Sequence, residues 1–351
     1  MNIVKTRLVK ELLSIAEKGY VPDSILRKGM RRMCRNRITD IRISDEITRE
    51  KYIKDFVDNM NRADIAPLPY FANQQHYEIP YNFFELVLGS YKKYSCGYWD
   101  DDTHDITQAE SQALRLTCQH ADIRDGHKIL ELGCGWGSLT LWLAEKFPGS
   151  HVTAISNSSS QRLYILKKIN ELSLTNVEVL TKDINHFTPK TNFDRIVSVE
   201  MFEHLRNYNE IFNRISQWLN KEGKFFMHIF CNELEPYLFV DRGPGDWMTR
   251  HFFSAGMMPS ADLPLYFQEA LTLDNEWHWD GIHYERTANA WLDNLDRNRS
   301  DALPILARIY GTENTNRWFH RWRLFFMACA ELFGMEKGSV WGVHHYRFNQ
   351  N

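Results

Sequence analysis

The feature that most constrains this chain is the alternation of strand-like and helix-like segments that begins at Lys128. Short apolar runs alternate with longer amphipathic stretches, which is typical of βαβ units. Strands joined by such crossovers lie parallel, and the crossovers are right-handed. Strands are predicted at 128–132, 151–155, 177–181, 193–199 and 224–230, with two late strands at 271–279 and 340–348. The predicted fold is therefore α/β, with one mostly parallel sheet.

Two further kinds of sequence accompany this sheet. Residues 1–105 combine helical periodicity with a stretch rich in Pro, Tyr and Asn, and we interpret them as a helical N-terminal extension and lid. Residues 106–351 are interpreted as the α/β domain, in which a helix is expected at 107–118. The segment 232–270 is too long for a simple connection, and we interpret it and a helical hairpin at 285–333 as substrate-covering insertions.

Composition excludes several classes of protein. The formal net charge of −3 gives no reason to expect a nucleic-acid partner, and no apolar run is long enough to cross a bilayer. The basic cluster between Arg27 and Arg37 favours a solvated helix face over an anionic-surface site. The N-terminus lacks a secretory signal, and the six cysteines form no C-x-x-C pair. We expect a cytoplasmic protein with reduced thiols, without stable membrane insertion, and a homodimer is left open.

Titratable side chains gather where the fourth predicted strand ends. Glu200, Glu203 and His204 follow an apolar run directly, in a segment, 200–206, that is predicted to be a loop. Asn207, with Glu210 three residues later, predicts the start of the next helix. Ligands of open parallel sheets bind at the carboxyl ends of the strands, so this loop is a candidate site. The alternative is a solvated loop with caps and surface ion pairs.

A glycine-rich turn follows the first predicted strand. Gly133, Gly135 and Gly137 allow close approach of a ligand, and the helix expected at 139–147 offers free N–H groups to an anion. A dinucleotide site would show G-x-G-x-x-G and an acid after the second strand, and neither is present. Asn157 and Gln161 could instead hold a ribose, while the plain alternative is a tight strand-to-helix turn.

Three motifs together carry a resemblance to a known family. They are the segments 131–137 (ELGCGWG), 94–99 (YSCGYW) and 197–204 (VSVEMFEH). The chain resembles the S-adenosylmethionine-dependent methyltransferases that join cyclopropane fatty acid synthases to coclaurine-type N-methyltransferases. The resemblance runs from about residue 65 to the C-terminus, and it includes Pro259-Ser260 and the segment 328–333 (ACAELF).

The resemblance implies a fold and a cofactor. It implies a class I methyltransferase, Rossmann-like, with a seven-stranded mostly parallel sheet, a helical N-terminal extension and an insertion after the fifth strand. Around S-adenosylmethionine it implies glycines at the methionine part, amides at the ribose, Asp183 at the adenine and Ser95 near the carboxylate. The implied cofactor-binding residues are Ser95, Gly133, Cys134, Gly135, Asn157, Gln161, Asp183 and Ile184.

The two branches of the family differ in chemistry. Cys96, Glu203 and His228 resemble residues that hold a bicarbonate in cyclopropane synthases, so they do not discriminate. At Glu200 that branch has glycine, and its late-helix tyrosine is absent from the segment 324–326. The resemblance therefore implies an N-methyltransferase acting on a small aromatic or alkaloid-like amine. The alternatives are a cyclopropane synthase-like lipid C-methyl(ene) transferase and a cofactor-binding regulatory module without activity.

The chemistry of amine methylation explains why carboxylates and an imidazole are expected at this site. The amine must lose a proton before its lone pair can attack, and carboxylates attract the ammonium form. With an ordinary pKa of about 6.5, His204 is suited to remove this proton, Glu203 to orient the ring and Glu200 to hold the cation. We therefore expect Glu203, His204 and Glu200 to be catalytic and no metal to be bound, because His228, His278 and His283 fall in different elements. The expected substrate-binding residues are Tyr98, Glu200, Phe202, His228, Phe252 and Trp322.

Overall fold

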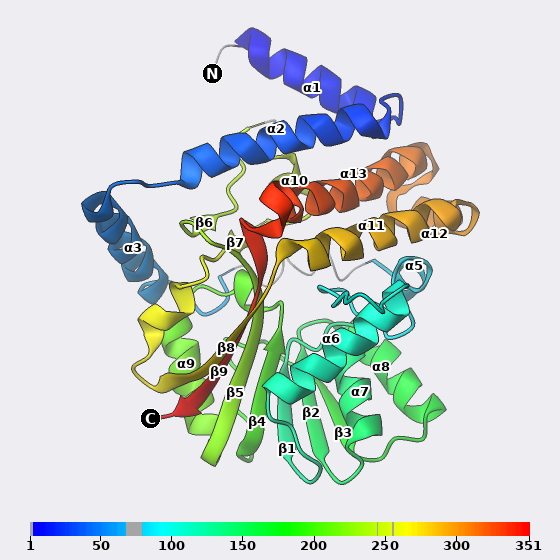
Figure 1. Cartoon of the computed structure of the whole chain (residues 1–351). Coiled ribbons are helices and arrows are strands. Elements are labelled where there is room, and N and C mark those ends of the chain that lie inside the picture. Colours follow the sequence, from blue (N-terminus) through cyan, green and yellow to red (C-terminus); the bar gives the residue numbers. More distant parts are fainter. Residues whose placement is uncertain (1–2, 68–78, 244, 255) are drawn as a thin grey trace.

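The computed structural model describes residues 3–67, 79–243, 245–254 and 256–351. Its centre is a seven-stranded sheet with the order β3-β2-β1-β4-β5-β9-β8, in which β9 alone runs antiparallel to its neighbours (Figure 1). The strands are β1 (Lys128–Leu132), β2 (His151–Ser156), β3 (Val177–Thr181), β4 (Phe193–Val199), β5 (Leu219–Asn232), β8 (Leu271–Trp279) and β9 (Trp341–Gln350). The predicted seven-stranded, mostly parallel sheet is confirmed.

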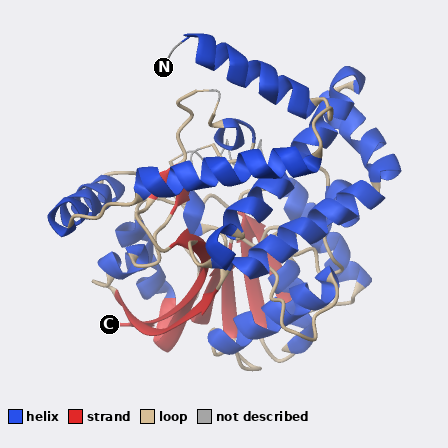
Figure 2. Ribbon diagram, turned by 45° about the horizontal axis from the view of Figure 1, so that its top comes forward, coloured by secondary structure: helices blue, strands red, loops and turns tan. Residues whose placement is uncertain are grey.

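Helices cover both faces of the sheet (Figure 2). On one face, residues such as Ile129, Val197 and Phe226 pack with the helices α6 and α7. On the other face, their sequence neighbours, among them Ile196 and Phe225, pack with α9. Adjacent residues of a strand point to opposite faces, which is why both can be apolar in a sheet buried on both sides. The helices next to the parallel strands are α6 (Ile106–His120), α7 (Ser138–Lys146), α8 (Ser159–Glu171) and α9 (Tyr208–Trp218).

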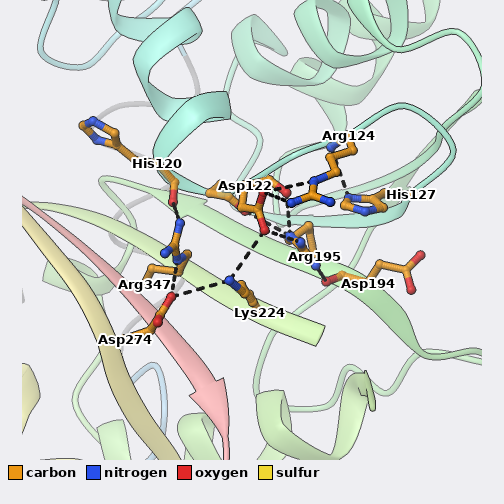
Figure 3. Close-up of polar contacts among 10 residues, drawn as sticks. His120, Asp122, Arg124, His127, Asp194, Arg195, Lys224, Asp274 and Arg347 are labelled. Carbon is orange, nitrogen blue, oxygen red and sulfur yellow. Dashed lines mark hydrogen bonds and ion pairs between the residues drawn. The ribbon is translucent and has the colours of Figure 1, made fainter. Parts of the chain in front are cut away.

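A charged network lies at the edge of the sheet where the parallel strands begin (Figure 3). Asp122, just after α6, accepts a 2.9 Å hydrogen bond from the Arg195 guanidinium and lies 3.5 Å from the Lys224 ammonium. Lys224 also lies 3.5 Å from Asp274, which pairs with Arg347 on β9. The network thereby joins the end of α6 to β4, β5, β8 and β9, on the sheet edge opposite the candidate site.

The remaining helices lie above the carboxyl ends of the parallel strands (Figure 1). The segment expected to be a helical hairpin at 285–333 contains three helices, because the chain breaks at Asn298 and again at Gly311 and the turn after it. This part of the prediction was wrong. The helices are α1 (Ile3–Glu17), α2 (Asp23–Ile41), α3 (Glu46–Asn61), α5 (Tyr81–Val87), α11 (Gly281–Arg297), α12 (Arg299–Tyr310) and α13 (Thr315–Phe333).

Ion pairs hold α2 against α13. Glu331 has a side chain that is only 7% exposed, and its two oxygens accept hydrogen bonds from Arg27 at 2.9 Å and Arg31 at 2.6 Å. Part of the basic cluster of the sequence therefore neutralises a buried acid instead of facing solvent. The last helix, in turn, contacts the aromatic residues that cover the sheet.

The insertion after β5 forms a small covering unit. It contains the short strands β6 (Tyr237–Leu238) and β7 (Met257–Met258), which pair antiparallel, and the helix α10 (Trp247–His251). Arg49 of α3 anchors it by hydrogen bonds to Glu235 at 2.9 Å and to Asp262 at 2.8 Å. Within the described part of the chain, no helix has the length and apolar character needed to span a bilayer.

Candidate active site

The glycine loop opens a space at the end of β1. Gly133, Gly135 and Gly137 all have left-handed φ values, of 78°, 51° and 80°. A Cβ atom at Gly133 would lie 2.8 Å from Met201 Sδ, whereas a Cβ atom at Gly135 would meet nothing within 4 Å. Gly133 is therefore required by packing, while Gly135 faces open space of the kind that a ligand fills.

A cavity of about 620 Å³, including the solvent at its mouth, lies beside this loop. Its wall contains Ser95, Gly133, Cys134, Gly135 and Gln161 of the expected cofactor residues, together with Glu200. The structure thus brings these residues together from four distant parts of the sequence.

Several buried polar atoms of the cavity wall have no hydrogen-bond partner among the described residues. They are Gln161 Nε2, Trp136 Nε1 and Ser138 Oγ. Ser156 Oγ donates to Gln161 Oε1 at 2.7 Å, which fixes the amide so that its nitrogen is left as a donor. A buried donor without an acceptor is unfavourable, so these atoms fit a polar ligand.

Lys93 is a site residue that the sequence interpretation missed. Its side chain is buried, and Nζ donates to Ser95 Oγ at 2.5 Å and to the Cys96 carbonyl at 2.7 Å. Burial lowers the pKa of Lys93, and no acid of the described chain lies within ion-pair distance of it. A buried ammonium on the cavity wall suits a ligand carboxylate. The only signal in the sequence was its position next to the motif 94–99.

The remaining expected cofactor residues lie at the ends of β2 and β3. Asn157 follows β2 and Asp183 follows β3, at the same edge of the sheet. Asp183 Oδ1 accepts the backbone N–H of Asn185 at 2.9 Å, which orients its carboxylate. Ile184 is buried in the α9 face of the core. These three do not belong to the wall of the cavity described above.

Glu200 is held by groups from three other elements. Oε1 accepts the backbone N–H of Cys96 at 2.9 Å and lies 3.2 Å from His228 Nε2, and Oε2 accepts the Tyr284 hydroxyl at 2.7 Å. Burial opposes ionisation, but the contact with His228, the charge of Lys93 and the Cys96 N–H outweigh it and lower the pKa of Glu200. Its φ of 48° is left-handed, a conformation that glycine adopts freely.

Buried imidazoles continue from Glu200 along the sheet. His228 Nδ1 lies 2.8 Å from His345 Nε2, and His345 Nδ1 lies 2.8 Å from His120 Nδ1. Burial lowers the pKa of His228 to about 4, although its hydrogen bond to Glu200 acts in the opposite direction. His228 is therefore neutral at pH 7, and its ring orientation is fixed from both sides.

Glu203 is fully buried, and only one of its two carboxylate oxygens has a hydrogen-bond partner among the described residues. Oε1 accepts the backbone N–H of Phe230 at 2.7 Å, and Oε2 has no partner among the described residues. Burial, followed by the nearby charge of Glu200, raises the pKa of Glu203 well above its ordinary value. The expected hydrogen bond from Glu203 to the His204 ring is not formed, because the carboxylate is turned toward β5.

His204 lies in a 3-10 turn, Phe202–His204, inside the segment predicted to be a loop. Burial, and next the charge of Arg206, lower the pKa of His204 to about 4. The imidazole is therefore a weaker base than its ordinary pKa suggested. The helix α9 begins as predicted, with the Asn207 side chain accepting the Glu210 N–H.

The aromatic residues expected to bind substrate separate into two groups. Tyr98 lies near the site: its ring stacks on His283 at 4.3 Å between centroids. Phe202 packs in the core against Phe225 at 5.5 Å, on the α9 side, so the structure assigns it to the core instead. Phe252 and Trp322 are both buried and lie 5.1 Å apart in the aromatic cluster of the covering helices, outside the cavity wall.

Comparison with known proteins agrees with this geometry. Residues 69–343 match the family model of mycolic acid cyclopropane synthetase. The (S)-coclaurine N-methyltransferase of Thalictrum flavum subsp. glaucum is 35% identical over 99% of this chain and 97% of its own length. The corresponding enzyme of Papaver somniferum is 33% identical over 97% of this chain and 98% of its own length.

A solved structure shows the same similarity in three dimensions. The crystal structure of coclaurine N-methyltransferase bound to N-methylheliamine and SAH superposes with a TM-score of 0.94 and 33% identity. The match covers 98% of this chain and 100% of that one. Both the sheet and the covering helices are therefore shared with that protein.

Proposed function

The chain belongs to the mycolic acid cyclopropane synthetase family of S-adenosylmethionine-dependent methyltransferases, and from this premise we propose that it methylates the nitrogen of a small aromatic or alkaloid-like amine. Both relatives named above are (S)-coclaurine N-methyltransferases by name, which supports an amine as the methyl acceptor. S-adenosylmethionine supplies an electrophilic methyl group on a sulfonium. The residues of the chain bind the amine, manage its proton and exclude water.

One observation carries the choice of an amine over a lipid double bond. In the cyclopropane-forming branch, the residues matching Cys96, Glu203 and His228 hold a bicarbonate. Here the carboxylate of Glu200 accepts the Cys96 N–H and contacts His228 Nε2. This contact supports a site in which the protein's own carboxylate replaces the bicarbonate. An ionised carboxylate fixed in this way attracts an ammonium group.

The proton of the amine needs an acceptor inside the site. We propose that Glu203 takes it, because its raised pKa makes its carboxylate a better base than His204, whose pKa is about 4. The unpartnered Glu203 Oε2 supports this role, since it is a buried acceptor in need of a donor. His204 stays neutral and supplies a hydrogen bond, and Glu200 holds the positive charge.

The cofactor would bind in the cavity beside the glycine loop. Ser95, Lys93 and the N-terminus of α7 would face its carboxylate, and Gln161 and Asn157 its ribose hydroxyls. Asp183 would bind the adenine amino group, next to Ile184. The unpartnered Gln161 Nε2 and the open space at Gly135 support this arrangement.

The covering segments would form the amine pocket. We propose that residues 1–105 and the insertions at 232–270 and 285–333 cover the substrate over residues 106–231. The contact of Cys96 with Glu200 supports this for the first segment, and Tyr284, the residue before the last insertion, reaches the same carboxylate. All six cysteines are free, which supports a cytoplasmic location. The oligomeric state that we propose to test, by sedimentation, is a homodimer.

Product analysis tests the proposed reaction. The full chain is incubated with methyl-labelled S-adenosylmethionine and either a mixture of secondary arylalkylamines or vesicles of unsaturated phospholipid. We expect a mass increase of one methyl group on an amine and no label in the lipid. Label in cyclopropane or methyl-branched acyl chains, with no amine methylated, would assign the chain to the lipid-modifying alternative.

A further inference from the structure

We propose that Glu233, His278 and His344 form a binding site for a divalent transition metal, with Zn²⁺ as the best match. These residues form a cluster at the end of β5 and along β8 and β9 in which one ligand atom of each lies within 4.8 Å of the others. The cluster contributes nothing to the methyl-transfer chemistry proposed above. Two imidazoles and one carboxylate are a common zinc ligand set, and they leave a fourth position for water.

The distances suit a single ion. Glu233 Oε1 lies 3.0 Å from His344 Nε2 and 3.7 Å from His278 Nε2. Two atoms bound to zinc at about 2.1 Å and separated by a tetrahedral angle lie about 3.4 Å apart. The two measured separations lie on either side of this value. The third separation, between ligand nitrogens of His278 and His344, is at most 4.8 Å, so side-chain rotation would bring the three atoms around one ion.

A second carboxylate contacts the ring nitrogen of the buried His344 that would not bind the metal. His344 Nδ1 lies 2.8 Å from Glu276 Oε1, while Nε2 faces Glu233. Metal-binding histidines usually donate their second ring N–H to a carboxylate, which fixes the ring and makes the metal-facing nitrogen more basic. Glu276 is placed to accept the Nδ1–H of His344 as in this pattern, and Nε2, which contacts Glu233 in the absence of an ion, would face the metal.

The backbone holds the three ligands rigidly. His278 and His344 are directly paired residues of the antiparallel strands β8 and β9. Glu233 follows β5, and its N–H donates to the Val340 carbonyl at 2.9 Å. A Cβ atom at Gly342 would lie 2.9 Å from His278 Nε2, so glycine there leaves room for the imidazole. Sites built on paired strands are more precise than sites on loops.

The cluster is accessible and separate from the methyl-transfer site. The side chains of His278 and Glu233 are 42% and 40% exposed, whereas His344 is 8% exposed. His344 lies on the opposite face of β9 from His345, which contacts His228. The sequence interpretation compared His278 with His228 and His283, and neither of these belongs to the cluster. Its actual partners are 45 and 66 residues away in the chain, at positions 233 and 344.

Calorimetric titration of the full chain with ZnCl₂ tests this site without any assay of methyl transfer. We expect one saturable equivalent, and with Co²⁺ we expect visible absorption bands typical of tetrahedral coordination. His278→Ala should weaken Zn²⁺ binding at least tenfold, and Glu233→Gln should do the same. The exposed His151, at the start of β2, supplies the control His151→Ala, which should bind like the wild type.

Two results would overturn the proposal. One is the absence of saturable Zn²⁺ binding to a folded wild-type chain, with circular dichroism as the check of folding. The other is binding that His278→Ala and Glu233→Gln leave unchanged. Because His278 and Glu233 are exposed, neither variant removes core packing, and weakened binding by a folded variant is direct support.

Discussion

At the scale of single residues, the loop after β4 combines carboxylates with opposite protonation tendencies. Glu200 is surrounded by donors, which favour the charged form, while Glu203 has one backbone donor and an apolar environment. Their pKa values are accordingly shifted in opposite directions, lower for Glu200 and higher for Glu203. A pair of carboxylates with oppositely shifted pKa values is typical of sites that bind a cation and move its proton.

The proton acceptor can be identified from pH profiles. Glu203→Gln should lower kcat/KM for the amine by about 10²–10⁴-fold, the usual contribution of a general base. In the wild type the rate should rise with pH as Glu203 loses its proton, at a pH above the ordinary carboxyl range, because its pKa is raised. His204→Asn should keep this rise while lowering the rate. If the rise of the rate with pH were lost in His204→Asn and kept in Glu203→Gln, His204 and not Glu203 would be the proton acceptor.

The hydroxyl of Tyr284 makes a second residue-scale prediction. Its 2.7 Å hydrogen bond to Glu200 Oε2 is a contact to a charged group, and such bonds contribute about 1.5–3 kcal/mol. Tyr284→Phe should therefore reduce kcat/KM for the amine by about 10–100-fold, while the Kd of S-adenosylmethionine stays unchanged. Tyr20→Phe, at an exposed tyrosine outside the site, is the control. Equal rates for Tyr284→Phe and the wild type would show that Glu200 does not need this donor.

At the scale of elements, the strands were predictable because each is a short apolar run between turn residues. The predicted ranges agree with β1, β3, β4 and β8, and the start of α9 was predictable from Asn207. The first residues of β5 were missed, because Leu219 to Gly223 is polar in part and pairs with β4 only through a register shift. The expected hairpin contains one break, whereas the structure has two, and the break at Asn298 is hard to predict because only this residue separates α11 from α12.

Asp122 provides a test at the level of elements, because it joins the end of α6 to β4 and β5. Its φ of 50° is tolerated by asparagine, so Asp122→Asn removes the charge without straining the backbone. Arg195, 8% exposed, would lose its carboxylate partner, and the free energy of unfolding should fall by about 1–3 kcal/mol at pH 7. Urea denaturation measures this, with the exposed Asp102→Asn as control.

The same residue predicts a dependence on pH. Burial acts to raise the pKa of Asp122, but Arg195, Arg124 and Lys224 outweigh it, and the net pKa is lowered. A lowered folded-state pKa stabilises the protein above the ordinary carboxyl pKa, and the contribution disappears as the pH falls through the folded value. The difference between wild type and Asp122→Asn should therefore shrink toward acid pH. A constant difference from pH 7 to pH 3 would contradict this account.

At the scale of the whole molecule, the covering helices depend on a few long-range contacts. The segment 328–333 carried part of the family resemblance, and the structure shows that its Glu331 binds Arg27 and Arg31 of α2. Tyr284 and Lys93 likewise reach the site from elements far from Glu200 in sequence. Contacts of this kind depend on tertiary packing, so neither periodicity nor local motifs could predict them.

Loss of the Glu331 contacts should loosen α2 without disturbing the sheet. Glu331→Gln keeps the size of the side chain and removes the charge that both arginines share. Hydrogen exchange followed by mass spectrometry should show amides of Asp23–Ile41 exchanging several-fold faster, while those of β4 and β5 are unchanged. Glu336→Gln, at an exposed position nearby in sequence, is the control. Unchanged exchange in α2 would mean that apolar packing alone holds this helix.

The central claim is that the carboxylate of Glu200 selects an amine, and paired kinetic and binding measurements on Glu200→Gln and Glu200→Gly test it most directly. The left-handed φ of this residue suits glycine, so the second variant removes the carboxylate without backbone strain. We predict that both variants lower kcat/KM for the methylated amine at least 100-fold, while the Kd of S-adenosylmethionine changes less than threefold. Amine turnover at the wild-type rate in either variant would contradict this account.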